Sequence, residues 1–421
     1  MATIEIRNLS KVFGSDPAPA LEMLEQGAGK DEIFKKTGLA VGLANVSFDV
    51  QEGEIVVVMG LSGSGKSTLV RCINRLIEPT AGKVVVDGTD VATLGKDELL
   101  DFRRRHFGMV FQHFALLPHR SVVANVEYGL EIQNREPGER REKAREALRL
   151  VGLEGWEDAR PAQLSGGMQQ RVGLARALAV DPQILLMDEA FSALDPLIRR
   201  DMQHELVSLQ ERMHKTIVFI SHDLDEAIKI GDRIVLMKDG AVVQVGTPEE
   251  ILTDPATEYV ARFVEDVDMS KVLTARSVMT RARVVAYPQD GPRTVLHKLR
   301  DENYSAIFAV ERDYRFRGLV GVDDLEQAMK RGDRDISAVI DADVPRVALD
   351  TPLTDLFPIL SGWRHALAVV DDADRLTGVV VKASVLEALA RGAGAAEETG
   401  PAAGPSGAAD AAPAEPAREA S

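Results

Sequence analysis

The sequence has one cysteine, no long apolar run and no long basic run, and each of these shortages excludes a class of protein. Cys72 alone cannot form an intrachain disulfide, which favours a reducing cytosol over the oxidising surroundings of secreted proteins. No apolar run approaches the roughly 18 residues of a membrane-spanning helix, and the N-terminal "MATIEIRNLSKVFG" lacks the apolar core of a signal peptide. With a net charge of −16 and no Lys/Arg run, the chain is not expected to have nucleic acid as its main partner.

What is present is typical of a soluble protein. The chain has 421 residues, of which 45% are hydrophobic and 28% charged, and this predicts two or three domains. Residues 15–44 carry only short helical patterns, and about 97–180 is mostly helical. Apolar runs predict strands at "TIEIRNL", "VSFDV", "GEIVVVMG", "QILLMDEA" and "TIVFISHD", and a hairpin in "RIVLMKDGAVVQVG" that turns at Asp239-Gly240.

A repeat occupies most of the C-terminal part. Residues 277–325 align with 337–385 without a gap, so that Ser277 meets Ser337 and "AIFAV" meets "ALAVV". Two short repeats predict a paired module rather than a solenoid. Residues 392–421 are rich in Ala, Gly, Pro and Glu, which predicts a disordered tail, with a functional acidic tail as the alternative.

A glycine-rich loop follows the strand "GEIVVVMG" and opens a predicted helix, which is the context of a phosphate-binding loop. Its glycines let backbone N–H groups surround phosphate oxygens, Lys66 brings a positive charge to the β- and γ-phosphates, and Ser67 offers its hydroxyl to Mg²⁺. A plain glycine turn before a helix is the alternative. The loop predicts nucleotide contacts from Gly60, Leu61, Ser62, Gly63, Ser64, Gly65, Lys66, Ser67 and Thr68.

Two acidic residues end the apolar strand "ILLMDE". Asp188 is placed to hold Mg²⁺ through water, and Glu189 is placed to take a proton from an attacking water as general base. An Asp-Glu pair after a strand is weak evidence alone, and the phosphate-binding loop upstream of it strengthens the prediction. Ser67, Gln112 and Asp188 are the predicted Mg²⁺ ligands.

Three further side chains are candidates for the same site. Gln112 follows the strand-like "FGMVFQ" and could reach Mg²⁺ and the nucleophilic water, and His222 ends the strand "TIVFISH". Phe13 could stack on adenine. The alternatives are a surface histidine for His222 and a core phenylalanine for Phe13. Lys66, Gln112, Glu189 and His222 are the predicted catalytic residues.

A second glycine-rich segment, "LSGGMQQRVGLARAL", opens another predicted helix. Together with "GLSGSGKST", Gln112, "ILLMDE", "SALD" and His222, it makes residues 1 to about 250 resemble the ATPases of ABC (ATP-binding-cassette) transporters. In that family the signature segment caps the γ-phosphate held by a partner cassette in a head-to-tail dimer. The resemblance implies ATP and Mg²⁺ as cofactors, a homodimer, and contacts to the partner's nucleotide from Ser165, Gly166, Gly167 and Gln169.

Two details of these motifs qualify the resemblance. Met168 stands where the family usually has Gln, which affects only the side-chain contact. Asp195, in "SALD", is implied to communicate between the two nucleotide sites across the dimer interface.

Other segments resemble one branch of the family. The insertion at 15–44, a repeat with "SVMT" and "GLVGVDDL" that is similar to a tandem CBS (cystathionine-β-synthase) module, and "LIEPTAGKVVVDG" resemble the ATPase subunit of glycine betaine/proline betaine importers. This implies uptake of a quaternary-amine osmolyte at the cytoplasmic face of the plasma (inner) membrane, with a separate permease and a periplasmic or lipid-anchored binding protein. Choline, carnitine and proline are alternative substrates. The stretch "FQHFALLPHRSV" is expected to meet the permease, with ordinary packing as the alternative for Phe114 and Leu117.

The CBS-like pair is expected to regulate the ATPase. Such modules bind adenosine-type ligands, often with an Asp that holds the ribose, and the first repeat has Asp324 there whereas the second has Ser384. An adenine nucleotide or a cyclic dinucleotide is the implied ligand. A purely structural role in dimerisation is the alternative.

The sequence therefore predicts an α/β P-loop NTPase, with a RecA-like core, a helical subdomain and an antiparallel β-subdomain, followed by an α+β tandem CBS pair. A soluble ABC ATPase that acts on DNA or the ribosome is the alternative from another class, and a non-catalytic sensor is opposed by Glu189 and His222. The expected domains are 1–265 for the ATPase (helical subdomain about 97–180), 266–276 for a linker, 277–334 and 335–391 for the CBS repeats, and 392–421 for the tail.

Overall fold

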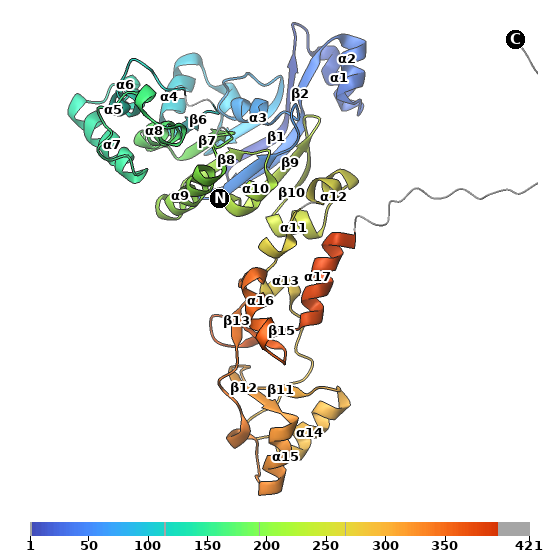
Figure 1. Cartoon of the computed structure of the whole chain (residues 1–421). Coiled ribbons are helices and arrows are strands. Elements are labelled where there is room, and N and C mark those ends of the chain that lie inside the picture. The colour runs from blue at the N-terminus through green and yellow to red at the C-terminus, as the bar shows by residue number, and fades with distance from the viewer. Residues whose placement is uncertain (1, 113–114, 193, 266, 395–421) are drawn as a thin grey trace, which may run out of the picture.

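The structure is a computed structural model that describes residues 2–112, 115–192, 194–265 and 267–394. Figure 1 shows a large α/β body, followed along the chain by two small lobes. No helix in the described part of the chain has both the length and the apolar content that crossing a membrane requires. The predicted tail falls outside the described residues, except for 392–394, which end the last helix.

A six-stranded sheet forms the centre of the large body. Its order is β10-β9-β3-β8-β7-β6, with β10 antiparallel to β9 and the other neighbours parallel. Residues of β3 alternate between two apolar clusters, so both faces of the sheet are buried and its strands are near-continuous apolar runs. The strands are β3 (Ile55–Met59), β6 (Phe107–Val110), β7 (Ile184–Asp188), β8 (Thr216–Ile220), β9 (Arg233–Lys238) and β10 (Ala241–Gly246).

The predicted hairpin between β9 and β10 is confirmed. Asp239 has φ 49° and Gly240 has φ 80°. Two consecutive positive φ values are those of a tight two-residue hairpin turn, which explains the Asp-Gly pair. The carbonyl of Gly240 accepts from Ala44 N, and its N–H donates to the Ser64 carbonyl, so this turn braces the glycine-rich loop.

A second, antiparallel sheet packs beside the core. Its order is β2-β1-β4-β5, built from β1 (Ala2–Phe13), β2 (Ala40–Gln51), β4 (Ala81–Val86) and β5 (Thr89–Asp90). Within the 15–44 insertion, α1 (Ala18–Glu25) and α2 (Lys30–Thr37) form where the sequence shows helical patterns. Buried Leu24 and Ile33 hold these helices against Val12 and Val41 of the sheet.

Helices account for most of residues 96–179, with β6 between the first and the others. Helix α8 packs against α5 and α7, whose buried faces join the larger apolar cluster. The remaining helices of the large body are α3 (Lys66–Ile73), α4 (Lys96–His106), α5 (Val122–Val126), α6 (Tyr128–Ile132), α7 (Pro137–Leu150), α8 (Gly166–Ala179), α9 (Pro196–Met213), α10 (Leu224–Ile230), α11 (Pro248–Thr253) and α12 (Glu258–Val264), with 3₁₀ turns η1 (Val91–Thr93) and η2 (Pro161–Gln163).

The two small lobes repeat one pattern of helix, strand, strand and helix. After η3 (Met269–Lys271) and α13 (Ala275–Val278), the first lobe contains α14 (Pro292–Asp301), β11 (Ala306–Val310), β12 (Phe316–Gly321) and α15 (Val322–Arg331). The second contains η4 (Ser337–Val339), β13 (Arg346–Ala348), α16 (Leu353–Gly362), β14 (Leu367–Val370), β15 (Leu376–Val380) and α17 (Lys382–Gly394).

The lobes exchange their leading segments. Thr280, which precedes the first lobe's strands, pairs with Val379 on β15, whereas Leu319 on β12 pairs with Asp341. Leu273 is likewise buried in the apolar cluster of the second lobe. Each lobe is therefore completed by a segment that a linear alignment of the repeats assigns to the other.

Candidate functional site

The glycine-rich loop lies between β3 and α3, at the carboxyl end of the parallel strands. Gly60 has φ 143°, and a Cβ there would lie 2.1 Å from the Met237 carbonyl oxygen. Gly65 has φ 101°, and its Cβ would lie 2.5 Å from the Gly42 oxygen. Both positions therefore require glycine, because a side chain would clash with the backbone of a neighbouring strand.

Lys66 is held inside this loop. Its Nζ donates to the carbonyl groups of Gly60 at 2.7 Å and Leu61 at 3.1 Å, and only 6% of the residue is exposed. Burial lowers the pKa of Lys66, while the charges of Glu189 and Asp188 act in the opposite direction. The ammonium thus has neutral carbonyl partners that the oxygens of a phosphate group could replace with stronger, charge-assisted bonds.

A cavity of about 610 Å³ opens over the loop, within the range of small-molecule sites. Five of its residues do not belong to the loop: Glu189 and His222, which the sequence predicts, and Lys30, Val41 and Gly42, which it does not. No motif marks the latter three, and only the fold brings them to the loop. The cavity is lined by Lys30, Val41, Gly42, Gly60, Leu61, Ser62, Gly63, Gly65, Lys66, Ser67, Thr68, Glu189 and His222.

Ser67 and Asp188 lie together as predicted for a Mg²⁺ site. The Ser67 hydroxyl donates to Asp188 Oδ1 at 2.9 Å, and the carboxylate is 5% exposed. Arg71 lies 3.4 Å from Asp188 Oδ2. A hydroxyl and a buried carboxylate beside a phosphate-binding loop are the oxygen ligands that Mg²⁺ prefers, so these residues fit the ion.

Glu189 has two of the predicted catalytic residues beside it. Gln112 Nε2 donates to Glu189 Oε2 at 3.2 Å, and His222 Nδ1 lies 3.5 Å from the same oxygen. Gln112 also donates to the Ser192 hydroxyl at 3.4 Å, and no hydrogen bond joins it to Ser67 or Asp188 among the described residues. Glu189 has φ 47°, a backbone conformation that costs energy outside glycine and that clusters at functional sites.

Phe13 is not a core residue. It ends β1 with 42% of its surface exposed, and Lys11 Nζ lies 5.2 Å from its ring centre. A Cβ on Gly42, which lines the cavity, would lie 2.7 Å from the Phe13 ring. The ring is therefore accessible beside the cavity, and the core alternative is wrong.

The second glycine-rich segment contributes nothing to this cavity. Ser165 caps α8, and its hydroxyl accepts from Met168 N at 3.3 Å, while Gly166 is exposed. A Cβ on Gly167 would lie 2.5 Å from Ile198 Cγ2. The amide of Gln169 donates to the carbonyl groups of Pro161 and Leu164, so this side chain is occupied within its own loop.

Asp195 is exposed at the start of α9, which it caps. Its Oδ1 accepts from Leu197 N at 3.2 Å and Ile198 N at 3.1 Å. These bonds use the carboxylate within its own chain and leave the residue on the surface. Ala193, in the same "SALD" segment, lies outside the described residues.

A buried polar group behind His222 was not predicted. Ser221 donates to Glu226, and Gln203 on α9 donates to the other oxygen of Glu226 at 3.0 Å. Burial raises the pKa of Glu226, while its hydrogen bonds to Ser221 and Gln203 act in the opposite direction. The residue before His222 is thus fixed from α9 and α10.

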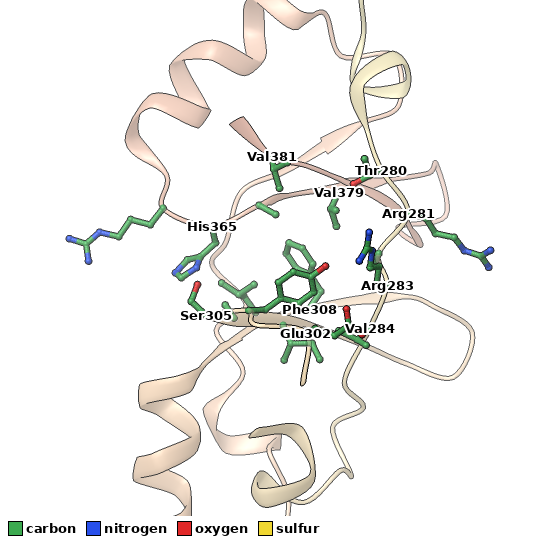
Figure 2. A pocket seen from close by; sticks show the side chains of 17 residues that line it. Thr280, Arg281, Arg283, Val284, Glu302, Ser305, Phe308, His365, Val379 and Val381 are labelled. Carbon is green, nitrogen blue, oxygen red and sulfur yellow. The ribbon is translucent and has the colours of Figure 1, made fainter. Parts of the chain in front are cut away.

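The two small lobes enclose a second cavity, of about 510 Å³ (Figure 2). Figure 2 shows Val379 and Val381 of the second lobe on one side and Ser305 and Phe308 of the first on the other, with the exposed Arg281 extending away from the centre. Three arginines, Arg281, Arg283 and Arg364, outnumber the acidic Glu302 among its lining residues, so the cavity has a positive balance.

Neither of the ribose-binding positions expected from the sequence, Asp324 and Ser384, lines this cavity. Val381, which lines it, has a carbonyl that accepts from the Ser384 hydroxyl at 2.9 Å. Asp324 does not line it, and its Oδ2 instead accepts from Gly321 N at 3.3 Å. Ser384 is thus in contact with a residue that lines the cavity, whereas the carboxylate of Asp324 is bonded at the start of its own helix.

An apolar groove of about 410 Å³ lies near Gln112, on the side of the helical region. Exposed apolar side chains line it, among them Leu100, Phe111, Tyr128 and Ile132. Of the residues expected to meet a permease, Phe114 lies outside the described residues, and Leu117 is half-buried with its N–H donating to Asn125 Oδ1 at 2.7 Å.

Known proteins resemble this chain over nearly its whole length. The ABC transporter family model matches residues 43–192, and the CBS domain model matches 275–331 and 335–391. The chain is 52% identical over 389 residues to the glycine betaine/carnitine transport ATP-binding protein GbuA of Listeria monocytogenes, covering 92% of this chain and 98% of that protein. It is 50% identical over 391 residues to the glycine betaine/proline betaine transport system ATP-binding protein ProV of Escherichia coli, covering 92% and 98%.

A solved structure that is similar to the large body is also an ATP-binding cassette. A dimeric ATP-binding cassette in a post-hydrolysis state, bound to ADP and Pi, is 36% identical with a TM-score of 0.50, covering 58% of this chain and 98% of that chain. The P-loop NTPase fold with a C-terminal CBS pair is thereby confirmed. The chain belongs to the ABC transporter family, as an ATP-binding subunit, an ATPase, of the glycine betaine/proline betaine importer type with a tandem CBS module.

Proposed function

We propose that this subunit hydrolyses ATP to power uptake of glycine betaine, proline betaine or a related quaternary amine through a separate permease. The observation that carries the ATPase site is the convergence of Lys66, Ser67 and Glu189 on one cavity, with Asp188 bonded to Ser67. The relatives' printed substrates support the quaternary amine. Recognition of the substrate itself is assigned to a periplasmic or lipid-anchored binding protein and to the permease.

The reaction follows from the positions of the side chains. Glu189 takes a proton from water, the water oxygen bonds to the γ-phosphorus, and the bond to the bridging oxygen of ADP breaks. Gln112 and His222 hold the Glu189 carboxylate from two sides. Lys66 neutralises charge on the β- and γ-phosphates.

Ser67 and Asp188 would hold Mg²⁺, with Gln112 as the third predicted ligand. When bound, the ion neutralises charge that develops on the phosphate oxygens. The phosphates would lie on the backbone N–H groups of the loop, and Phe13 would stack on adenine.

Two copies of the chain would enclose two nucleotides. Ser165, Gly166 and Gly167 begin a helix of 14 residues, which is suited to an anion, and they do not line the cavity of their own chain. These residues would therefore cap the triphosphate held by the partner, and the exposed Asp195 would contact the partner across the interface. The resemblance to a dimeric cassette supports this arrangement.

The permease would dock in the groove lined by Leu100, Phe111 and Tyr128. This groove lies on the helical region next to Gln112, so movement of the predicted nucleotide ligand and of the docked segment would be coupled. The subunit would then work as a peripheral protein on the cytoplasmic face of the plasma (inner) membrane. Nucleic acid is not proposed as a partner, because the net charge of −16 would repel its phosphate backbone.

The CBS pair would regulate the ATPase by binding a nucleotide. Its cavity combines arginines with the aromatic rings of Tyr304 and Phe308, a combination that suits the phosphate and base of an adenine nucleotide or a cyclic dinucleotide. Asp324 and Ser384 do not line the cavity, although the Ser384 hydroxyl donates to the carbonyl group of Val381, which does. Dimerisation without a ligand is the alternative that the experiment below separates.

The substrate is tested by uptake into vesicles that contain this subunit with its cognate permease and binding protein. Radiolabelled glycine betaine and proline betaine are expected to enter in an ATP-dependent manner and to outcompete choline, carnitine and proline. Uptake of one of these three in preference to both betaines would overturn the substrate proposal.

Deleting 270–421 tests regulation by the CBS pair. The truncated subunit is expected to keep its ATPase activity and to lose its response to added cyclic dinucleotide, whereas an unchanged response would leave only a structural role for the pair.

A further inference from the structure

The insertion at 15–44 reaches the nucleotide cavity. Lys30, the first residue of α2, lines it together with the glycine-rich loop, and its Nζ donates to the Gly63 carbonyl at 3.3 Å. Three residues that line the cavity belong to no motif, and of these Lys30 carries a charge, whereas Val41 and Gly42 do not. The insertion therefore brings a cation to a site whose other charged residues come from the sequence motifs.

Packing holds Lys30 in this position. Ile33, one turn further along α2, is fully buried against β1 and β2. The Lys30 side chain passes over the turn between β9 and β10, where a Cβ on Gly240 would lie 2.8 Å from Lys30 Cε. Gly240 in turn donates to the Ser64 carbonyl. The aliphatic part of Lys30 is thus confined beside the loop, and its ammonium is directed at the cavity.

The charge of Lys30 is poorly matched by its surroundings. Its hydrogen bond goes to a neutral carbonyl, and no ion pair joins it to a carboxylate in the described part of the chain. Burial lowers the pKa of Lys30, and the more distant charges of Asp239 and Asp31 oppose that shift. A half-buried ammonium of this kind gains most from an anionic ligand, because a charge-assisted bond to phosphate is stronger than one to a neutral carbonyl.

We propose that Lys30 binds the polyphosphate of ATP, so that the α1–α2 insertion supplies a residue of the nucleotide site. Lys30 then exchanges the Gly63 carbonyl for a phosphate oxygen when ATP enters. Since Lys30 begins α2, this exchange ties the position of the insertion to the occupancy of the site.

The test is equilibrium binding to the full-length chain in the Glu189→Gln background, which slows turnover. Lys30→Ala is expected to weaken ATP about tenfold, to weaken ADP less, and to leave adenosine within about twofold. Lys30→Arg keeps the charge and is expected to restore most of the ATP affinity. Lys35→Ala is the matched control, because Lys35 lies on the same helix and is exposed.

Two outcomes of the binding measurement, and one of thermal melting, would overturn the proposal. One is an ATP affinity for Lys30→Ala equal to that of Lys35→Ala. The other is an equal loss for adenosine and ATP, which would mean that Lys30 only supports the shape of the loop. Thermal melting of each variant without nucleotide is expected to match the parent chain, and a lower melting temperature for Lys30→Ala that Lys30→Arg does not restore would also favour the purely structural role.

Discussion

The guanidinium of Arg199, on α9, lies 3.6 Å from the carboxylate of Asp223 and donates to the carbonyl groups of Ser192 and Leu194. A single side chain thereby connects the "SALD" segment with the residue that follows His222. Movement at the expected dimer interface would therefore be transmitted to the histidine beside the general base.

Replacing Arg199 with alanine should lower ATP hydrolysis about tenfold, the equivalent of losing about 1.4 kcal/mol of barrier stabilisation. ATP affinity should change little, because Arg199 does not line the nucleotide cavity. Phosphate release and nucleotide binding are measured on the same preparations, with the exposed neighbour Arg200→Ala as control. Equal losses in the two arginine variants would contradict the connecting role.

Glu189→Gln should reduce hydrolysis on the order of 100-fold or more, because the general base is lost while an amide of the same shape remains. ATP should still bind and should hold two copies together, since the capping residues are intact. Gel filtration with ATP and without it measures the dimer. A Glu189→Gln chain that stays monomeric with ATP would argue against the enclosed-nucleotide dimer.

Glu226→Gln should make stability less dependent on pH. Burial raises the pKa of Glu226 in the folded chain above its ordinary value of 4.5, so the folded state holds this proton more tightly than the unfolded state does. The contribution of protonated Glu226 to the free energy of unfolding is then fully present below pH 4.5, and it is lost as the pH rises through the pKa that Glu226 has in the folded chain. Denaturant melts should show the variant gaining stability relative to the parent chain as pH rises from 4.5. Glu142→Gln, at an exposed position of α7, should show no such trend, and a flat difference for Glu226→Gln would refute the prediction.

Cys72 should be unreactive in the folded chain. It is 1% exposed on α3, and burial raises the pKa of its thiol to about 12, so almost no thiolate is available at neutral pH. A thiol reagent should label it stoichiometrically only after denaturation, and the single cysteine of the chain makes the signal unambiguous. Rapid labelling of the native protein would mean that α3 opens easily.

Gly60→Ala should abolish nucleotide binding and lower stability by about 1–3 kcal/mol, because the new Cβ would meet the Met237 carbonyl in a backbone conformation that disfavours it. Calorimetric melting and ATP binding measure the two effects. Gly138→Ala on α7, where nothing lies within 4 Å of the new Cβ, should leave both unchanged or slightly improved. A Gly60→Ala chain that binds ATP normally would show that the loop can shift away from β9.

The nucleotide site could largely be predicted from the sequence, because its chemistry depends on short motifs. The spacing of glycines fixes the loop around Lys66, and an acidic pair after an apolar strand places Asp188 and Glu189 at the same sheet edge. The roles of Gln112 and His222 are harder to predict from the sequence, because each is a single polar residue that follows a strand. Their contacts with Glu189 agree with the prediction that they share its site.

Other parts of the site could not be predicted, because they depend on contacts between distant segments. Lys30 reaches the cavity only because Ile33 packs against Val12 and Val41, on the strands that precede and follow α1 and α2. Glu226 and Gln203 meet because α10 packs against α9, and neither residue belongs to a motif. The position of the CBS cavity depends on the exchange of segments between repeats, which a gap-free alignment conceals.

The exchange of segments also determines how a ligand in the cavity between the two small lobes could affect the ATPase body. Thr280 lines the cavity, and its N–H is bonded to the Val379 carbonyl. Directly before it, α13 and η3 run back as a short packed stretch, in which Met269 touches both the second lobe and the ATPase body. A ligand that displaces Thr280 would therefore also shift the segment that ends at Met269. Because Met269 packs against the ATPase body, ligand binding between the lobes would alter a contact of the part of the chain that hydrolyses ATP.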